Sequence, residues 1–232
     1  MLGAPMFGSA NIPKRIKVLL AIVLAYGLSL SIPQVELPAS IWTLAVGIAC
    51  ELLFGWAMGM ALSFTFIAVS WAGEIIGQQL GINLGEVFDP QYGKSSSLIG
   101  DMYFMLALVT FLLCGGHRQM IQGIRESFDA LPLLSVSITP SVFNLLLDLL
   151  HAATLLAMQM AAPMLLTMLV VDLAMGFVGK TMPQFNVLSS GIALKSLVGI
   201  GVLLASLTLT SETIRQSLMV SVDTVRTVWA GK

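Results

Sequence analysis

Residues 73–85 read GEIIGQQLGINLG and place four glycines at intervals of four: Gly73, Gly77, Gly81 and Gly85. Positions i and i+4 stack on one face of a helix, so the spacing predicts a ridge without side chains against which another backbone packs closely. Glycine costs about 1 kcal/mol per interior helix position relative to alanine. Close packing or controlled bending must therefore compensate at these positions.

The composition predicts a membrane-associated chain. The 232 residues are 57% hydrophobic and 10% charged, and the mean hydropathy is +0.93. Soluble domains carry about 25% charged residues. A net charge of -1 excludes the basic surface that nucleic-acid binding requires. The two cysteines, Cys50 and Cys114, fit neither a CxxC redox pair nor a zinc site.

Apolar stretches separated by charged residues are predicted to form helices, and they occupy residues 18–32, 37–73, 102–116, 151–171 and 196–211. The second stretch is long enough for two segments or for one long tilted helix. The first, third and fifth are shorter than the roughly 20 residues of a spanning helix. Hydropathy therefore predicts membrane association without predicting that every stretch spans. Within the fourth stretch, Pro163 is expected to kink the helix.

The beginning of the chain resembles a secretory signal, because three basic residues at positions 14–17 precede an apolar run. No convincing cleavage site follows, and further apolar stretches come at once. We therefore favour a helix of the mature protein.

Small residues recur every four positions a second time, with an acid in the row. Gly55 and Gly59 follow Glu51 at this interval and are predicted to pack against a neighbouring helix. An ionisable residue inside an apolar helix is a candidate for a buried polar contact or a subunit contact. The alternative for Glu51 is a position at a helix break near the membrane interface.

Three further polar residues are candidates for the same kind of contact. Glu74 and Gln78 run beside the first glycine ridge. Lys195 stands alone among apolar residues, and an unpaired ammonium there is costly. We expect Lys195 to face an acid or carbonyl groups at a subunit contact, with snorkelling to the membrane interface as the alternative.

Residues 87–97 read VFDPQYGKSSS and interrupt the helical pattern. Pro90 disfavours a helical conformation at Asp89, and Gly93 with the serines predicts a pliable polar loop. One interpretation is an ordinary turn, with Ser97 or Asp101 capping the next helix. The other is a movable constriction, formed where a glycine-hinged helix leads into a flexible loop.

Catalytic motifs are absent from the sequence. His117 and His151 belong to no HExxH pattern, no GxSxG elbow is present, and the glycine-rich stretch lacks the Lys-Ser/Thr of a phosphate loop. The sequence therefore predicts no enzyme, no cofactor and no metal site.

Several motifs in order resemble the FliR proteins of the flagellar export gate, a family that includes the SctT proteins of virulence type III secretion. They are APMFG, AGEIIGQQLG, FDP, GGH and PQFN, at residues 4–8, 72–81, 88–90, 115–117 and 183–186. Together these motifs extend over nearly the whole chain. The motif at residues 72–81 resembles the flagellar members of the family more than the virulence-type members. Family members usually carry another hydrophobic helix before the first motif; that helix is expected to be missing here, either because the start is truncated or because this member lacks it.

This resemblance implies an all-α, membrane-associated subunit of tilted helical hairpins that depends strongly on assembly with partner subunits. It implies one FliR-like domain over residues 1–232, located in the bacterial inner membrane at the flagellar basal body. The implied partners are FliP-like, FliQ-like and FlhB-like subunits, and the implied substrates are unfolded flagellar proteins.

The resemblance also assigns residues 80–96 to the family's plug, which closes the channel at rest. Gly73 and Gly77 are then packing positions, whereas later glycines supply flexibility. The expected gating residues are Leu80, Gly81, Leu84, Gly85, Val87, Phe88, Asp89, Pro90 and Gly93.

Two other classes of protein remain open alternatives besides a virulence-type SctT homologue. A small-solute transporter would also be helical with glycine-broken segments, but it would show matching breaks in its two halves, and none is found. A purely structural scaffold would need no closing segment.

Overall fold

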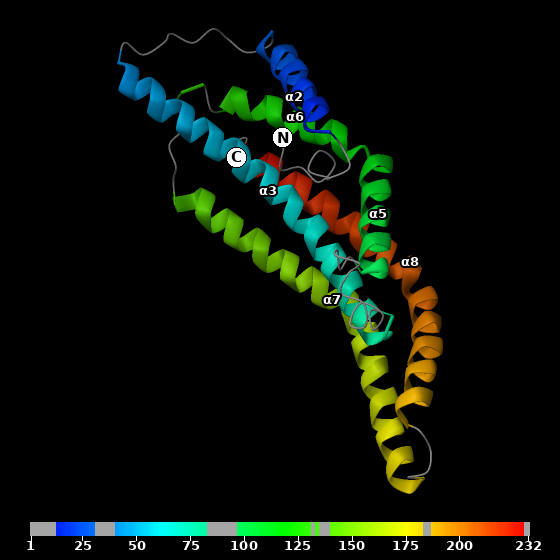
Figure 1. The fold of residues 1–232 in the computed structure, drawn as a ribbon. Helices are drawn as coiled ribbons and strands as arrows, with labels where there is room; N and C mark the ends of the chain where they lie inside the picture. The colour runs from blue at the N-terminus through cyan, green and yellow to red at the C-terminus, as the bar shows by residue number, and fades with distance from the viewer. Residues whose placement is uncertain are drawn as a thin grey trace. The chain divides into compact units, whose positions relative to one another are not determined.

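The computed structural model describes residues 13–30, 40–82, 97–130, 133–134, 140–182 and 187–229. These residues form helices and turns without a strand, which confirms the all-α prediction (Figure 1). The helices are α2 Lys14–Ser29, α3 Ile41–Gln79, α5 Leu98–Leu113, α6 Gly116–Ala130, α7 Pro140–Thr181 and α8 Val187–Trp229.

Within the described residues, each of the five predicted apolar stretches falls mainly in a helix, but the predicted lengths were partly wrong. Residues 41–73 of the second stretch belong to one helix, α3, which continues through Gln79. α7 and α8 extend well beyond 151–171 and 196–211. Apolar content marks the part of a helix that avoids water, whereas backbone hydrogen bonds and caps determine where the helix ends. The helix assignment of α7 also continues through Pro163.

The polar helix α6 was not predicted. Its sequence GHRQMIQGIRESFDA contains no long apolar run, so a search for such runs passes over it. The available signal was the helical spacing of Met120, Ile124 and Ser127, which lie on its less exposed side.

Three helical segments are long and apolar enough to cross a membrane: Ile41–Gln79, Leu146–Thr181 and Ser190–Thr224. A fourth crossing results if α5 and α6 together form one bent span. In each segment, an apolar stretch of 18 residues meets the requirement for a crossing, and 44%, 28% and 6% of that stretch is buried, respectively. The apolar surface of α8 is therefore almost entirely left for lipid or protein to cover.

The chain divides into two compact units, and each is described by itself. Unit 1 comprises Met1–Phe66, Phe111–Ala152 and Ser217–Lys232. Its described core includes a cluster of Ala57, Ala61 and Leu149.

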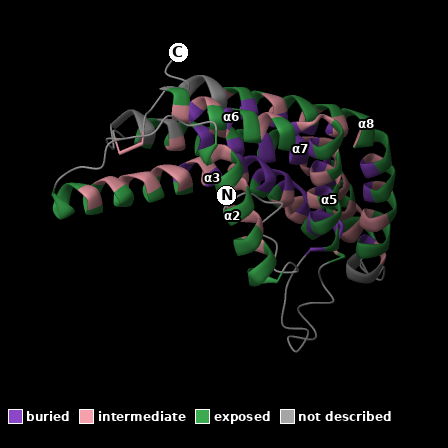
Figure 2. Ribbon diagram, turned by 90° about the horizontal axis from the view of Figure 1, so that it is seen from above, coloured by how far each residue is buried: buried purple, intermediate pink, exposed green. Residues whose placement is uncertain are grey.

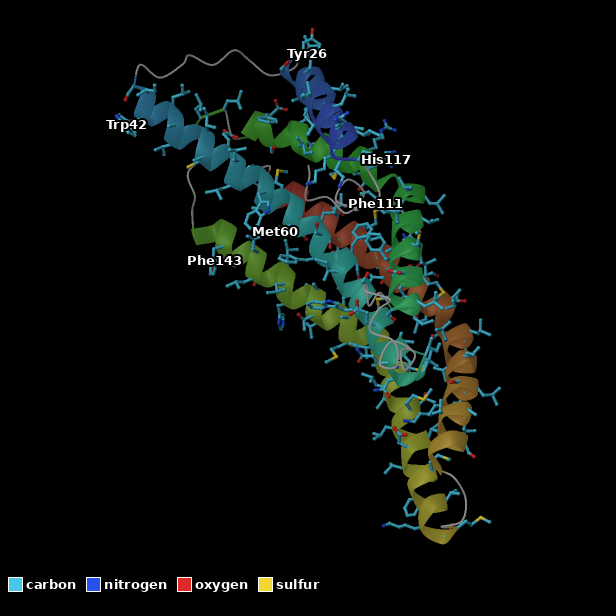
Figure 3. The ribbon with its side chains drawn as sticks, viewed as in Figure 1. Tyr26, Trp42, Met60, Phe111, His117 and Phe143 are labelled. Carbon is cyan, nitrogen blue, oxygen red and sulfur yellow. The ribbon has the colours of Figure 1, made fainter. Side chains whose placement is uncertain are left out.

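The rings of Phe66 and Phe111 meet edge to face in unit 1, with centroids 5.6 Å apart. A buried hydrogen bond of 2.6 Å joins the hydroxyls of Thr65 and Ser221. By contrast, α2 has no buried residue, and Trp42 at the start of α3 projects outward (Figures 2 and 3).

Unit 2 comprises Ile67–Thr110 and Ala153–Gln216. Its largest fully buried side chains are Leu80 of the turn after α3, Tyr103 of α5, Met168 of α7 and Ile214 of α8. Residues near 175, 172 and 168 of α7 meet residues near 191, 195 and 199 of α8 in turn. These contacts define an antiparallel pair of helices, which lie side by side in Figure 1.

The Phe66–Phe111 contact generates a prediction about stability. Phe111 is 2% exposed, and removing a buried phenyl ring costs about 3 kcal/mol. We expect Phe111→Ala to lower the thermal midpoint of the detergent-purified chain measurably. Leu113→Ala in the same helix is the matched control, because Leu113 is 82% exposed. Equal midpoints for the two variants would contradict this account of the core.

Candidate functional site

α3 and α5 contact each other through glycines in unit 2. A Cβ atom added to Gly73 would lie 2.7 Å from the carbonyl oxygen of Ile99 and 2.8 Å from Cα of Gly100. A Cβ atom added to Gly100 would lie 3.1 Å from Cγ of Glu74. Backbone atoms cannot move aside as a flexible side chain does. Any side chain at Gly73 must therefore push the two helices apart.

Ser97 caps the first turn of α5 immediately beside this crossing. Its Oγ accepts a hydrogen bond from the backbone N–H of Gly100 at 3.3 Å, and its carbonyl accepts one from Asp101 N at 2.9 Å. Ser97 is buried, whereas Asp101 is exposed in the first turn. Of the two candidate caps, Ser97 is therefore the one that the structure uses.

The other end of the site is the turn that terminates α3. Leu80 is completely buried, and its carbonyl oxygen accepts a hydrogen bond from Ser196 Oγ at 3.0 Å. A Cβ atom added to Gly199 of α8 would overlap the Leu80 side chain. Gly81 follows with φ 71, a left-handed conformation that glycine adopts without strain. The chain thus leaves α3 at a position fixed by α8.

Seven of the predicted gating residues lie outside the described residues: Leu84, Gly85, Val87, Phe88, Asp89, Pro90 and Gly93. Of the predicted gating residues, the structure places Leu80 and Gly81. Together with Ser97, they hold the two ends between which residues 83–96 run. We call Leu80, Gly81, Ser97, Ser196 and Gly199 the anchor residues.

The remaining glycines of the two ridges differ in their surroundings. Gly77 and Gly59 are buried, and the Gly59 carbonyl accepts a hydrogen bond from Ser63. Gly55 is half-buried, and a Cβ atom there would meet nothing within 4 Å. Equal spacing along α3 therefore does not give equal contacts within the chain.

Glu51 binds a turn of unit 1. Its Oε1 accepts a hydrogen bond from the backbone N–H of Leu134 at 3.1 Å. Leu134 has φ 67, which is unusual for a residue with a side chain. A Cβ atom at Gly47, one helical turn before Glu51, would lie 2.7 Å from Cδ2 of Leu134. The acid and the glycine together hold this turn against α3.

The three other polar candidates occupy different environments. Glu74 is half-buried against Gly100, and Gln78 is exposed. Lys195 Nζ lies 2.5 Å from Oδ1 of Asp172. The acid that Lys195 contacts thus belongs to the same chain. Sequence reasoning missed Asp172, although positions 172 and 195 lie at similar distances from the end of α7 at Thr181 and the start of α8 at Val187.

The described residues offer no cluster of side chains for metal binding. Within the described ranges, no group of three or more His, Cys, Asp or Glu side chains could hold a metal ion. His117 and His151 are exposed on two different helices. The candidate site therefore consists of packing and capping contacts: the close crossing at Gly73, the helix cap Ser97 and the buried Leu80.

Comparison with known sequences identifies similar proteins. The family described as Bacterial export proteins, family 1, matches residues 1–220. Flagellar biosynthetic protein FliR of Aquifex aeolicus (strain VF5) is 32% identical over 214 residues, covering 90% of this chain and 81% of that protein. The protein of the same name from Escherichia coli (strain K12) is 30% identical over 203 residues, covering 87% and 77%. The one from Bacillus subtilis (strain 168) is 29% identical over 237 residues, covering 97% and 88%.

The glycine contacts predict opposite effects for two substitutions in α3. We expect Gly73→Ala to lower the thermal midpoint in detergent, because the methyl group meets the α5 backbone. Gly55→Ala should leave the midpoint unchanged or raise it slightly, since alanine favours the helix by about 1 kcal/mol and space is available. A midpoint for Gly73→Ala at or above that of the parent would contradict the close crossing.

The Glu51 contact predicts a difference between two other variants. Glu51→Ala leaves the Leu134 N–H without its acceptor, at a cost of about 1–3 kcal/mol. Glu51→Gln keeps an acceptor oxygen, so it should retain most of the parental stability in detergent. The idea fails if the glutamine variant unfolds at the same temperature as the alanine variant.

Proposed function

The chain belongs to the bacterial export proteins of family 1, and we propose that it is a subunit of the flagellar type III protein export gate. In this proposal it forms, with FliP-like and FliQ-like subunits, the channel through which unfolded flagellar proteins leave the cytoplasm, and an FlhB-like subunit contacts the assembly. It acts in the inner membrane at the flagellar basal body. It is a structural subunit and not an enzyme.

The uncovered apolar surface supports an assembly role. The apolar window of α8 is only 6% buried within the chain, and large apolar side chains are exposed on every long helix. A single chain leaves these surfaces to lipid or to other subunits. The similar proteins have flagellar names, which favours the flagellar system over the virulence system.

We further propose that residues 80–96 close the channel at rest. The observation that carries this proposal is the anchoring of Leu80, which is buried against Gly199 and bonded through its carbonyl to Ser196. Ser97 provides a second fixed point at the start of α5. A segment held at both ends can stay in place at rest.

The composition of the segment suits reversible closure. Leu84, Val87 and Phe88 are apolar and stand between glycines and a proline that weaken helix formation. An apolar constriction excludes ions by dewetting, without binding cargo tightly. A mobile closing element is held by few contacts, because such elements come from the least stable parts of a structure.

The direct test deletes residues 89–95 in cells that keep the other export subunits. We expect the variant to assemble but to raise ion leakage across the membrane, measured as loss of membrane potential during expression. Substitution of both Val87 and Phe88 by serine should give a smaller leak of the same kind. Tight membranes with parental secretion in both variants would show that the segment is only a turn.

The anchor residues give an independent prediction with a matched control. Gly199→Val should displace Leu80 and increase leakage, because the new side chain overlaps that leucine. Gly201→Val adds the same side chain two residues along α8, where a Cβ atom meets nothing within 4 Å. Leakage from both variants or from neither, with assembly intact, would contradict the role of the anchor.

A further inference from the structure

The ion pair between α7 and α8 lies on the surface of the hairpin and not inside it. Asp172 and Lys195 are joined at 2.5 Å, yet their side chains keep 48% and 29% of their exposure. Both residues lie within segments that are apolar enough to span a membrane. Asp172 is nine residues from the end of α7 at Thr181, or about 14 Å along the helix axis.

Exposed apolar side chains surround the pair. Leu169, one turn before Asp172, is 56% exposed, and Ile192 of α8, one turn before Lys195, is 38% exposed. Gly176, one turn after Asp172, has nothing within 4 Å of an added Cβ atom. The carboxylate is therefore accessible in the middle of an apolar face. We call Leu169, Asp172, Gly176, Ile192 and Lys195 the hairpin face.

This face suits neither lipid nor water. In hydrocarbon, charged groups in spanning helices face a protein interior or a water-filled cavity, because exposing them to lipid is costly. In water, the apolar side chains beside the pair would remain as an exposed apolar patch. An apolar patch with one charged pair at its centre matches the core of a protein interface, where a few polar contacts determine specificity.

The charges of Asp172 and Lys195 determine which kind of hydrogen-bond donor a partner can bring to this face. Lys195 already neutralises Asp172 through Oδ1. Among the described residues, no other ion pair or hydrogen bond to Asp172 is present, so Oδ2 has room for a further donor. A cation arriving there would leave a net positive charge in an apolar contact, whereas a neutral donor would not.

From this arrangement we propose that the hairpin face docks a helix of a neighbouring export-gate subunit, which donates a hydrogen bond from a hydroxyl or amide side chain to Asp172. The inference rests on the proposed function, because it requires that assembly. Gly176 allows the partner helix to approach, and Leu169 and Ile192 supply the apolar contact around the hydrogen bond.

The test compares two double variants that both remove the internal ion pair. Asp172→Leu with Lys195→Met replaces the pair by apolar side chains, which is often neutral for the stability of the chain itself. Asp172→Asn with Lys195→Met also removes both charges but keeps an acceptor oxygen at position 172. The readout is the amount of other export subunits that copurifies with the tagged chain from membranes.

We expect the leucine–methionine variant to lose copurifying subunits by roughly tenfold, because the partner's donor is left without an acceptor in an apolar interface. The asparagine–methionine variant should recover most of the parental amount. Asp129→Asn is the control, since Asp129 is an exposed acid on the polar helix α6, and it should have no effect. The thermal midpoint of each purified chain in detergent should stay near that of the parent.

A parental amount of copurifying subunits in the leucine–methionine variant would overturn the inference and leave the proposed function intact. A parental chain that copurifies with no export subunit would contradict the proposed function as well. A photo-crosslinker at Leu169 in the otherwise parental chain gives a second readout that does not depend on these variants. Crosslinks to an export subunit are expected there, and crosslinks to lipid alone would overturn the inference.

Discussion

The approach of two backbones at Gly73 and Gly100 is the contact on which the arrangement of unit 2 depends. A side chain at Gly73 would meet main-chain atoms of α5 at less than 3.0 Å, so the helices pack at this distance only without one. The crossing places Ser97 at the start of α5 beside α3. Further along α3, the packing of Leu80 against α8 adds a third helix to the same compact body.

Sequence patterns predicted the helical class and the membrane character, because both follow from composition and local periodicity. Contacts were harder to predict. Gly73 and Gly55 belong to similar four-residue rows, yet one meets the α5 backbone and the other meets open space. A repeat of small residues identifies a face of a helix, but what lies opposite depends on where the chain returns. Asp172 was missed for the same reason, since its pairing with Lys195 requires the register of α7 against α8.

The capping of α5 shows a more local limit of prediction. Both Ser97 and Asp101 are acceptable caps by residue type, and the choice depends on which of them stands immediately before the first helical residue. Ser97 does so and is buried by its neighbours. The helix α6 was missed for a different reason. Its amphipathic spacing is present in the sequence, but the helix contains too few apolar residues to be recognised by hydropathy.

Glu51 recognises a backbone amide at position 134 and not the side chain that stands there. Every amino acid except proline supplies that N–H group, so the contact itself leaves position 134 free to diverge among related chains. The left-handed φ of 67 narrows this freedom toward glycine and asparagine. Positions 51 and 134 are therefore coupled through geometry alone. A comparison of diverged sequences would find an acceptor retained at one position and a changing residue at the other, a pattern that residue-to-residue covariation would not detect.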